Sequence, residues 1–552
     1  MRTPALTSAR LVASGLALAA LGALTVPAAN AHAADHAADH AADHAADHAA
    51  ATDNATAPAW TQRIDWTTTT LAPGVQLRTG ALSDATSTPF WTVTIPHTVT
   101  SSITGAPASA ELGPRDWAEQ TADSLRDAGF TPRLDALPWP AYADTPHGLQ
   151  GIRVRTGEYA TQAEATAAVA RLKALGFTTA TAEWTGYDGD TAPDGEQIHV
   201  AVIDQRHYAG TVYGTHHGDV AQRQKLSTVS GDLGATVAVN GGFFVTADAD
   251  GYQGAPTGLA AYDGELESLD NGARSGIVLG DGPARIARLS ASVTIRDGRA
   301  SYAVNGINRK PGVVRDCGRP GGEPTDEPRQ DVTCHVSSEL VLFTPMLGAA
   351  LPTGDGTQVV LDRRGVVTSE GARGGEVPEG GTVVQGVGDA GDWLAAHAQP
   401  GHRLTVTEAV RDGRGRPVPL TPRTSIVSAA PNLLTDGRTD IDAAAEGVID
   451  PADLSFNYAW AEIRQPRTMA GIDRAGRLLL VTVDGRQPGV SEGLTLTEEA
   501  ELLKSLGAVD ALNLDGGGST AIAAGGTLLN HTSDATGERA DGDFIVAVPN
   551  RR

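Results

Sequence analysis

The stretch Ala511-Leu512-Asn513-Leu514-Asp515-Gly516-Gly517-Gly518-Ser519-Thr520 decides how the C-terminal part of this chain folds. Its first residues alternate as in a strand, and the strand ends at an aspartate followed by three glycines. Consecutive glycines can turn several backbone N–H groups toward one anion, and the hydroxyls of Ser519 and Thr520 add donors. The pattern predicts a strand end that carries a binding loop.

The residues before this stretch complete a strand–helix–strand unit. An apolar strand ends at Asp484, and residues 496–506 read as a helix that begins with a capping box of Thr495 and Glu498. A unit of this length predicts two parallel strands joined by a right-handed crossover. Parallel strands end on one edge of a sheet, so we expect Asp484 and Asp515 to share a ligand-binding rim.

A third strand end has the same design. Residues 235–239 lead to Asn240, which is followed by Gly241 and Gly242. Adjacent glycines allow a sharp bend and a close backbone approach. Because Asp-Gly or Asn-Gly after a strand is often only a turn, each feature is weak alone. Three polar strand ends and a triple glycine together favour a functional edge.

Composition and missing motifs exclude several classes of protein. The 552 residues include 42 basic and 66 acidic side chains, a net charge of −24 that argues against nucleic-acid and anionic-lipid partners. The 65 glycines and 31 prolines indicate many turns. His-Glu-x-x-His, Cys-x-x-Cys, Gly-x-Ser-x-Gly and P-loop motifs do not occur in the sequence. We predict no cofactor and assign no metal ligands, while dependence on a divalent metal stays open.

The N-terminus reads as an export signal. Arg2 and Arg10 precede an apolar run over residues 11–26, and residues 29–31 offer a cleavage site, so residues 1–31 are predicted to be a signal peptide. The apolar run is shorter than the ~20 residues of a membrane span. We therefore expect a secreted protein with no membrane span after signal cleavage.

A low-complexity segment follows the signal. Residues 33–48 read Ala-Ala-Asp-His four times, which would place the histidines along one helical face and could bind a transition metal weakly. The favoured interpretation is a spacer, and residues 32–84 are assigned to spacer and linker.

The two cysteines have a simple interpretation. Cys317 and Cys334 flank a loop rich in Pro, Gly and polar residues. In an oxidising compartment such a pair favours a disulfide, which would stabilise the fold by ~3 kcal/mol in the chain-entropy model. The alternative is a metal or catalytic thiol, and His335 alone beside the pair makes a poor zinc set.

Residues 90–185 contain an internal duplication. Each half has a strand, a helix closed by glycine and a further strand, with Leu125 and Gly129 matched by Leu172 and Gly176. Two such halves predict a small βαββαβ module. Its second half, Gly151-Ile152-Arg153-Val154-Arg155-Thr156-Gly157-Glu158-Tyr159 and the following alanine-rich helix, resembles the SPOR domain. The resemblance covers residues 85–186 and implies binding to peptidoglycan glycan strands.

The remaining segment, residues 198–550, reads as one large α/β (α+β) domain with a mixed sheet and few helices. Several of its strings occur in a characteristic order: Val239-Asn240-Gly241-Gly242-Phe243-Phe244, Asn305-Gly306-Ile307-Asn308-Arg309, Pro466-Arg467-Thr468, Val483-Asp484-Gly485-Arg486 and the stretch 511–520. They resemble the phosphodiester glycosidase family, whose members remove a sugar from a sugar-phosphate diester. A segment that is often Gly-Gly-x-Pro-x-Leu in the family reads Ser428-Ala429-Ala430-Pro431-Asn432-Leu433 here.

The resemblance implies roles for the residues on the predicted rim. Glycoside hydrolysis commonly uses two carboxylates, and we expect Asp484 and Asp515 to be that catalytic pair. Guanidinium groups and backbone N–H groups suit a phosphate leaving group. The expected substrate-binding residues are Asn240, Gly241, Gly242, Arg309, Arg467, Arg486, Asn513, Gly516, Gly517, Gly518, Ser519 and Thr520.

The sequence predicts one function and leaves two alternatives open. The prediction is a secreted glycosidase that cleaves a sugar-1-phosphodiester or related bond in cell-wall or extracellular glycans and is held at peptidoglycan by the SPOR-like module. The first alternative is a hydrolase of a neutral wall glycan or exopolysaccharide. The second alternative is a non-catalytic wall-binding protein.

Overall fold

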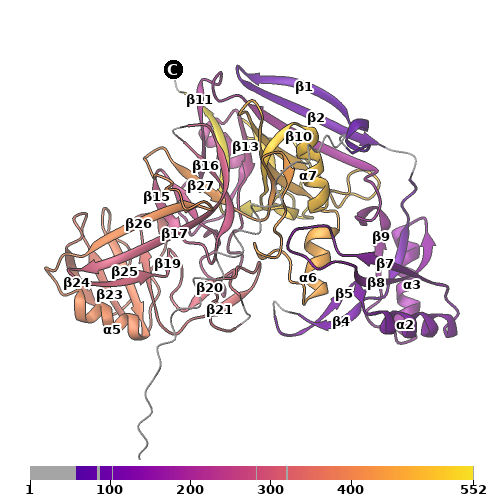
Figure 1. The fold of residues 1–552 in the computed structure, drawn as a ribbon, viewed down its shortest axis with the longest axis horizontal. Coiled ribbons are helices and arrows are strands. Elements are labelled where there is room, and N and C mark those ends of the chain that lie inside the picture. The colour runs from indigo at the N-terminus through magenta and orange to yellow at the C-terminus, as the bar shows by residue number, and fades with distance from the viewer. Residues whose placement is uncertain (1–57, 84–86, 102–103, 281, 319–320, 551–552) are drawn as a thin grey trace, which may run out of the picture. The chain divides into compact units, whose positions relative to one another are not determined.

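The computed structural model describes residues 58–83, 87–101, 104–280, 282–318 and 321–550 (Figure 1). The predicted signal peptide and the Ala-Ala-Asp-His repeats lie outside the described residues. Within the described part the chain is a mixed α+β protein built mostly of strands, which confirms the predicted fold class. In the same part of the chain, no helix is long and apolar enough to cross a membrane.

The largest sheet has eight strands and carries the predicted rim. Its central strand β31 (Leu478–Val483) is buried along its whole length, as expected for a strand covered on both faces. The strand order is β1 (Asp65–Ala72), β2 (Val75–Ser83), β10 (Gly195–Ile203), β31, β30 (Arg467–Asp473), β32 (Ala508–Asn513), β28 (Asn432–Thr435) and β29 (Arg438–Thr439).

The predicted pairing of β31 with β32 is wrong in one respect. Strand β30 lies between them and pairs antiparallel with both. The two flanking strands therefore run in the same direction and end on the same edge, as predicted, but they are not neighbours. Strand β30 begins at that edge, which brings Arg467 opposite Val483.

The helix between the two strands forms as predicted. Helix α7 (Leu496–Ser505) begins with the capping box of Thr495 and Glu498, and Gly507 follows its end with a φ of +91°. The helix packs against β32 and β28 and buries Leu496 and Leu503. Each fully buried leucine contributes about 1.5–3 kcal/mol from the hydrophobic effect.

Residues 65–83 correct the predicted spacer boundary. They form β1 and β2, and β2 pairs antiparallel with β10 over its whole length, so these residues are part of the large sheet and not a linker (Figure 1). Strand β1 contains four consecutive threonines and is mostly exposed. Its sequence therefore lacks the alternation of apolar and polar residues that predicts a strand. The 3₁₀ turn η1 (Thr61–Arg63) precedes β1.

A second sheet packs against the large one. Its strands are β11 (Gly210–Thr215), β36 (Phe544–Pro549), β13 (Val237–Asn240), β33 (Ile522–Ala524) and β34 (Thr527–Leu528), with helix α4 (Leu226–Leu233) beside it. Val239 and Ile545 belong to the same hydrophobic core as Met469 and Leu512 of the large sheet. The short strands β12 (Gln224–Lys225) and β35 (Ala540–Asp541) pair nearby.

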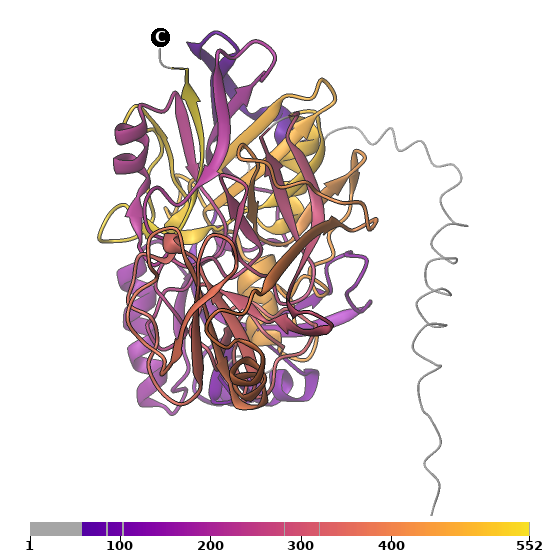
Figure 2. The same ribbon diagram turned by 90° about the vertical axis from the view of Figure 1, so that its left-hand side faces the viewer.

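Two further sheets share a separate core (Figure 2). One consists of β15 (Glu265–Ser268), β14 (Ala260–Tyr262), β27 (Ser425–Ser428), β16 (Arg274–Leu279), β17 (Arg285–Asp297), β18 (Ala300–Val304) and β26 (Thr405–Asp412). The other consists of β19 (Gly306–Ile307), β22 (Glu339–Phe343), β25 (Thr382–Val387), β23 (Thr357–Leu361) and β24 (Val367–Gly371), covered by α5 (Gly388–His397).

The predicted βαββαβ module is present and has its own core. Helices α2 and α3 cover one face of its sheet and bury Ala118, Leu125 and Leu172. Its elements are β3 (Trp91–Thr94), β4 (His97–Thr100), β5 (Pro107–Ala110), β6 (Leu112–Gly113), α2 (Arg115–Asp127), β7 (Pro132–Pro138), β8 (Leu149–Tyr159), α3 (Gln162–Ala174) and β9 (Thr181–Trp184).

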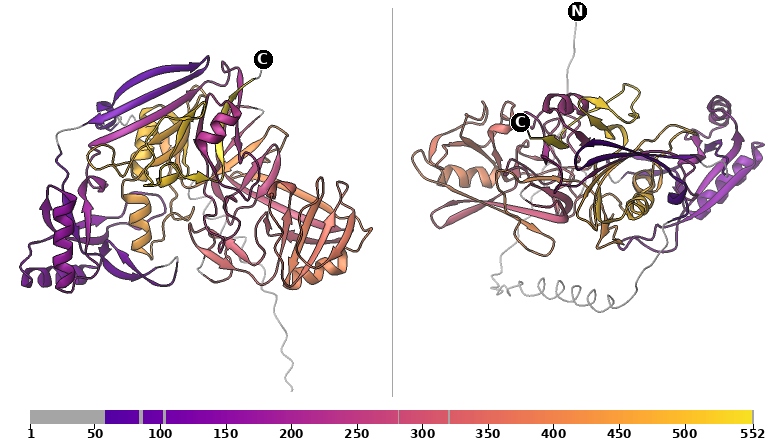
Figure 3. Two further views of the ribbon diagram at one scale, coloured as in Figure 1. Left: turned by 180° about the vertical axis from the view of Figure 1, so that it is seen from behind. Right: turned by 90° about the horizontal axis from the view of Figure 1, so that it is seen from above.

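Two arginines on the module sheet are buried. Arg153 and Arg155 on β8 are 1% exposed, and both form ion pairs with Asp188. Arg153 also donates a hydrogen bond to the hydroxyl of Tyr458, which follows the short helix α6 (Leu454–Asn457). The module is therefore packed against the segment around α6 (Figure 3).

The predicted disulfide between Cys317 and Cys334 is confirmed, with the two Cα atoms 5.9 Å apart. It closes the hairpin of β20 (Val313–Arg315) and β21 (Thr333–His335). Both cysteines are fully buried and form a small core with Val314 and Val332.

Candidate functional site

A cavity of about 410 Å³ opens at the edge of the large sheet where β32 ends and β30 begins. Segments far apart in sequence supply its walls. They are Phe243, Phe244 and Thr246; Gln330 and Asp331; Ala459 and Trp460; Gln465 and Arg467; Arg486; Asn513 and Asp515 to Gly518; and Arg539. Of the predicted site residues, the cavity brings together Asp515, Arg467, Arg486, Asn513, Gly516, Gly517 and Gly518.

Asp515 is the carboxyl group best placed for chemistry in this cavity. Its backbone N–H donates to Gly241 O at 3.0 Å, and its carbonyl oxygen accepts from Asn240 Nδ2 at 2.7 Å. Its Oδ1 accepts from the backbone N–H of Gly516 at 2.9 Å. Burial raises the pKa of Asp515 to about 7, although a hydrogen bond from Ser519 acts in the opposite direction. A carboxyl group that titrates near neutrality can transfer a proton under ordinary conditions.

A second carboxyl group interacts with Asp515. Asp541 on β35 is 2% exposed, and burial together with the charge of Asp515 raises its pKa well above the usual value. Two interacting buried carboxyl groups do not readily ionise together, so the charge of Asp515 opposes ionisation of Asp541.

Three guanidinium groups line the cavity. Arg467 is 4% exposed, donates through Nε to Leu494 O at 2.8 Å and lies 3.0 Å from Glu499 Oε1. Arg539 pairs with Asp534 through two hydrogen bonds of 2.9 and 3.1 Å. Arg486 is exposed at the rim. Guanidinium groups recognise phosphate and carboxylate oxygens with paired N–H donors, so this cavity suits an anionic group.

An aromatic wall contributes to the same cavity. Phe243 and Trp460 meet edge to face with ring centroids 6.1 Å apart. Trp460 belongs to a π-helical turn, η4 (Tyr458–Glu462), of a kind found often at functional sites. Phe243 and Phe244 follow directly on the predicted Asn240-Gly241-Gly242 turn. Their place in the sequence could have predicted that they line the cavity, but they were not among the predicted site residues.

The disulfide-closed loop supplies a further wall. Gln330 and Asp331 lie between the two cysteines and line the cavity, and Asp331 pairs with Arg315 at 2.7 Å. Burial and the neighbouring Asp316 raise the pKa of Asp331. Nothing in the loop sequence indicated this contact, because it depends on how two separate sheets pack.

Asn513 carries an open hydrogen-bond acceptor. Its Nδ2 donates to Ala430 O at 2.6 Å. Its Oδ1 is buried and has no hydrogen-bond partner within the described part of the chain. Because Asn513 lines the cavity, a ligand hydroxyl could satisfy this oxygen.

Asp484 is not among the residues that line the cavity, contrary to the expectation of a catalytic pair at one rim. Its Oδ1 accepts from Asn530 Nδ2 at 3.1 Å and its Oδ2 from the backbone N–H of His531 at 3.0 Å. Asn530 in turn donates to Thr520 O at 3.1 Å. These hydrogen bonds connect Asp484 to the segment that follows the glycine loop.

Other predicted binding residues also serve the framework. Asn240 is fully buried, and its Oδ1 accepts from Thr468 Oγ1 at 2.7 Å and from Ala521 N at 3.1 Å. Arg309 pairs with the buried Glu339 on another sheet. Neither lines the cavity, and the same holds for Gly241, Gly242, Ser519 and Thr520.

Two backbone N–H groups of the predicted anion-binding glycine loop already donate hydrogen bonds within the protein. The N–H of Gly516 donates to Asp515 Oδ1, and the N–H of Gly517 donates to Pro466 O at 2.8 Å. Glycine is required here for the turn: Gly517 has a φ of +59°, and a Cβ on Gly516 would lie 2.8 Å from Pro466 O. The positive charge at the cavity comes from the side chains of Arg467, Arg486 and Arg539.

The fold and the cavity define a two-module protein with a strand-edge cavity lined by arginines, carboxyl groups and aromatic rings. Among the described residues, no group of three His, Cys, Asp or Glu side chains is arranged to hold a metal ion.

Comparison with known proteins gives the family. The phosphodiester glycosidase model matches residues 355–548 and the SPOR model matches residues 111–180. The chain therefore contains a domain of the phosphodiester glycosidase family in its C-terminal half together with a SPOR domain.

Several relatives are similar over part of the chain. The mouse N-acetylglucosamine-1-phosphodiester alpha-N-acetylglucosaminidase is 32% identical over 117 residues, which are 21% of this chain and 22% of the mouse protein. The bovine protein of the same name is 42% identical over 80 residues, 14% of this chain and 15% of its own. These matches thus span under a quarter of either curated relative.

Among solved structures, a putative exported protein of Burkholderia pseudomallei is 32% identical with a TM-score of 0.75, covering 90% of this chain and 99% of that one. A hypothetical protein from Synechocystis, 19% identical with a TM-score of 0.50, covers 88% of this chain and 76% of its own and shares the fold.

Proposed function

We propose that this protein is a glycosidase that hydrolyses a sugar-1-phosphodiester in cell-wall or extracellular glycans. One observation carries the proposal: Asp515, with a pKa of about 7, lines the same cavity as Arg467, Arg486 and Arg539. The names of the mouse and bovine relatives support N-acetylglucosamine as the sugar to test first.

The proposed reaction breaks the bond between the anomeric carbon and the phosphate oxygen. A phosphate monoester is a weak base and leaves with little protonation, so the reaction needs one carboxylate in contact with the attacking water. Asp515 takes the proton from water as the new carbon–oxygen bond forms. The arginines hold the charge that develops on the leaving phosphate.

The remaining parts of the site would orient the sugar. Trp460 and Phe243, whose rings meet edge to face, offer apolar surface against which a pyranose ring can pack. The open acceptor on Asn513 would take a hydrogen bond from a sugar hydroxyl. In this proposal Asp484 is a positioning residue that acts through Asn530 and the glycine loop.

We further propose secretion and attachment to peptidoglycan. The predicted signal peptide 1–31 and the exported Burkholderia relative support secretion, and the SPOR domain supports a wall location. We propose residues 85–186 as the SPOR-containing module and residues 198–550 as the glycosidase domain, with β1 and β2 added to the latter.

The test compares two substrates that differ in the leaving group. The purified full chain should release sugar from N-acetylglucosamine 1-(methyl phosphate) much faster than from the neutral methyl glycoside. The three arginines disfavour the alternative of a purely neutral glycan substrate, and equal rates on both would support that alternative instead. Absence of hydrolysis of both would support the non-catalytic alternative and overturn the proposal.

A further inference from the structure

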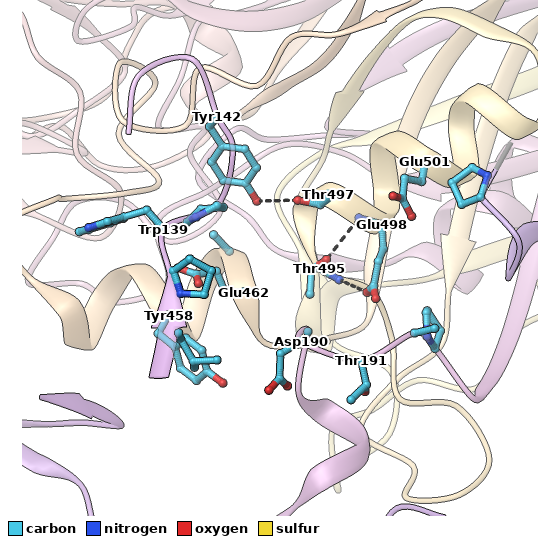
Figure 4. A pocket seen from close by; sticks show the side chains of 18 of the residues that line it. Trp139, Tyr142, Asp190, Thr191, Tyr458, Glu462, Thr495, Thr497, Glu498 and Glu501 are labelled. Carbon is cyan, nitrogen blue, oxygen red and sulfur yellow. Dashed lines mark hydrogen bonds between the residues drawn. The ribbon is translucent and has the colours of Figure 1, made fainter. Parts of the chain in front are cut away.

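A second pocket, of about 400 Å³, lies where the SPOR-containing module meets the glycosidase domain (Figure 4). Its walls come from the chain after β7, from the linker around Asp190, from the π-helical turn and from the start of α7. All of these segments belong to one compact unit of the chain. The cavity that holds Asp515 shares none of its lining residues with this pocket.

Aromatic side chains form one wall of this junction pocket. Trp139 and Tyr142 follow β7, and Tyr458 lies below them (Figure 4). Trp60, from the segment before β1, also lines the pocket. Several prolines, among them Pro140, add rigid apolar surface. Flat apolar walls of this kind match the C–H faces of a pyranose ring.

Tyr142 brings an unpaired donor to the pocket. The residue is 5% exposed, and its hydroxyl oxygen accepts a hydrogen bond from Thr497 Oγ1 at 3.3 Å across the pocket (Figure 4). The hydroxyl proton of Tyr142 has no acceptor within the described part of the chain. A buried hydroxyl normally pairs its proton, so this one calls for an acceptor on a ligand.

Four acidic side chains also line the pocket, and each has a partner in the protein; Asp190 pairs with Arg153 at 3.3 Å. Glu501 accepts from Trp60 Nε1 at 2.7 Å, and Glu498 accepts from Arg464 at 2.7 Å. Glu462 accepts from Gln150 at 2.5 Å, and burial raises its pKa to about 7. These hydrogen bonds hold the carboxyl groups in place while leaving lone pairs that can accept from hydroxyl groups.

The charge of the lining excludes an anionic ligand. No lysine, arginine or histidine is among the described residues that line the pocket. A phosphate or carboxylate placed there would face Asp190 and the three glutamates, because the arginines that pair with Asp190 and Glu498 are not part of the lining. The combination of aromatic faces, partnered carboxylates and an open tyrosine donor fits a ligand with hydroxyl groups and no charge.

We propose that the junction pocket binds an uncharged saccharide unit of a glycan chain. The proposal goes beyond the hydrolysis proposed above and does not depend on it. One face of the module sheet is covered by α2 and α3, and Arg153 and Arg155 on the other are buried against Asp188. The pocket beside β7 is thus an accessible place for this module to bind glycan. The glycosidase domain supplies the remaining walls of the pocket.

The test measures binding of the uncharged β-1,4-linked tetramer of N-acetylglucosamine to the full chain by calorimetry. A background substitution, Asp515→Asn, prevents turnover in the other cavity. We expect Trp139→Ala to weaken binding about tenfold or more, and Tyr142→Phe about fivefold. Trp393→Ala serves as the matched control, because Trp393 is a partly buried tryptophan packed on another core. It should leave binding unchanged.

Three outcomes would overturn the proposal. They are no binding of the tetramer, binding that is unaffected by both pocket substitutions, and displacement of the tetramer by glucose 1-phosphate, which would place it in the arginine-lined cavity. Tyr142→Phe keeps the ring and the packing, so its result holds even if Trp139→Ala unfolds the chain. Hydrolysis by each pocket variant without the background substitution is measured in parallel, which separates failure of this proposal from failure of the proposed activity.

Discussion

The strand-edge cavity and the junction pocket have almost the same volume, about 410 and 400 Å³, and opposite chemistry. The first gathers three arginines around two carboxyl groups, Asp331 and Asp515, and burial raises the pKa of Asp515 to about 7. The second gathers aromatic rings and carboxylates without a cation among its described lining residues. In a chain with a net charge of −24, arginines from segments far apart in sequence thus come together at one cavity. The comparison teaches that the lining, and not the overall charge, sets which ligand each pocket takes.

The largest expected effect separates the two pockets by chemistry. Asp515→Asn should lower kcat for the sugar-1-phosphodiester about 10³-fold, because the amide cannot take a proton from water. Saccharide binding in the junction pocket should not change. Steady-state kinetics and calorimetry on the same preparation check both points. Asp510→Asn, further from the cavity on β32, is the matched control and should keep full activity.

The rim arginine gives the next effect. Arg486→Gln should lower kcat/KM for the phosphodiester about 10²-fold, because a cationic contact to the leaving phosphate is lost. Hydrolysis of a neutral glycoside, if any is measurable, should not fall. The exposed Arg414 offers a control in Arg414→Gln. A loss of the same size on both substrates would mean that Arg486 holds the fold and not the phosphate.

Asp484→Asn should have a smaller effect, about tenfold on kcat/KM, because it disturbs the position of the glycine loop without touching substrate. Asn530→Ala should produce a similar loss through the same contact. Combining the two should cost little more than either alone, since both remove one interaction. Fully additive losses in this double-mutant cycle would contradict the positioning role.

The smallest effect concerns pH. Asp515 must be ionised to act as a base, so kcat/KM should rise as the pH increases through about 7. The charge of Asp331 also raises the pKa of Asp515. Asp331→Asn should therefore move the rising limb to lower pH by less than about one unit. A pH–rate profile with no rising limb near neutrality would contradict the assignment of Asp515 as base.

Much of the fold could be predicted because its signals are local. The capping box of Thr495 and Glu498, the glycine stops of the module helices and the apolar run of β31 each depend on neighbouring residues. The insertion of β30 between β31 and β32 could not be predicted this way. Strand order depends on long-range pairing, and β1 and β2 were missed because a threonine-rich strand with an exposed face lacks a clear alternation.

The site shows the same division. Asp515, Arg467 and Arg486 lie at strand ends or just beyond them, so their edge of the sheet could be predicted from the sequence. Asn240 also follows a strand and precedes glycines, but its strand belongs to the second sheet. Its buried side chain forms hydrogen bonds to Asp515 and Thr468. Residues from other sheets and loops, such as Trp460, reach the cavity only through tertiary packing.

The most direct test of the central claim is hydrolysis of N-acetylglucosamine 1-(methyl phosphate) in water enriched in heavy oxygen, followed by mass spectrometry of both products. The account predicts that the heavy oxygen appears in the sugar, because water attacks the anomeric carbon and the carbon–oxygen bond breaks. Heavy oxygen in the phosphate product would show cleavage of the phosphorus–oxygen bond and would contradict a glycosidase.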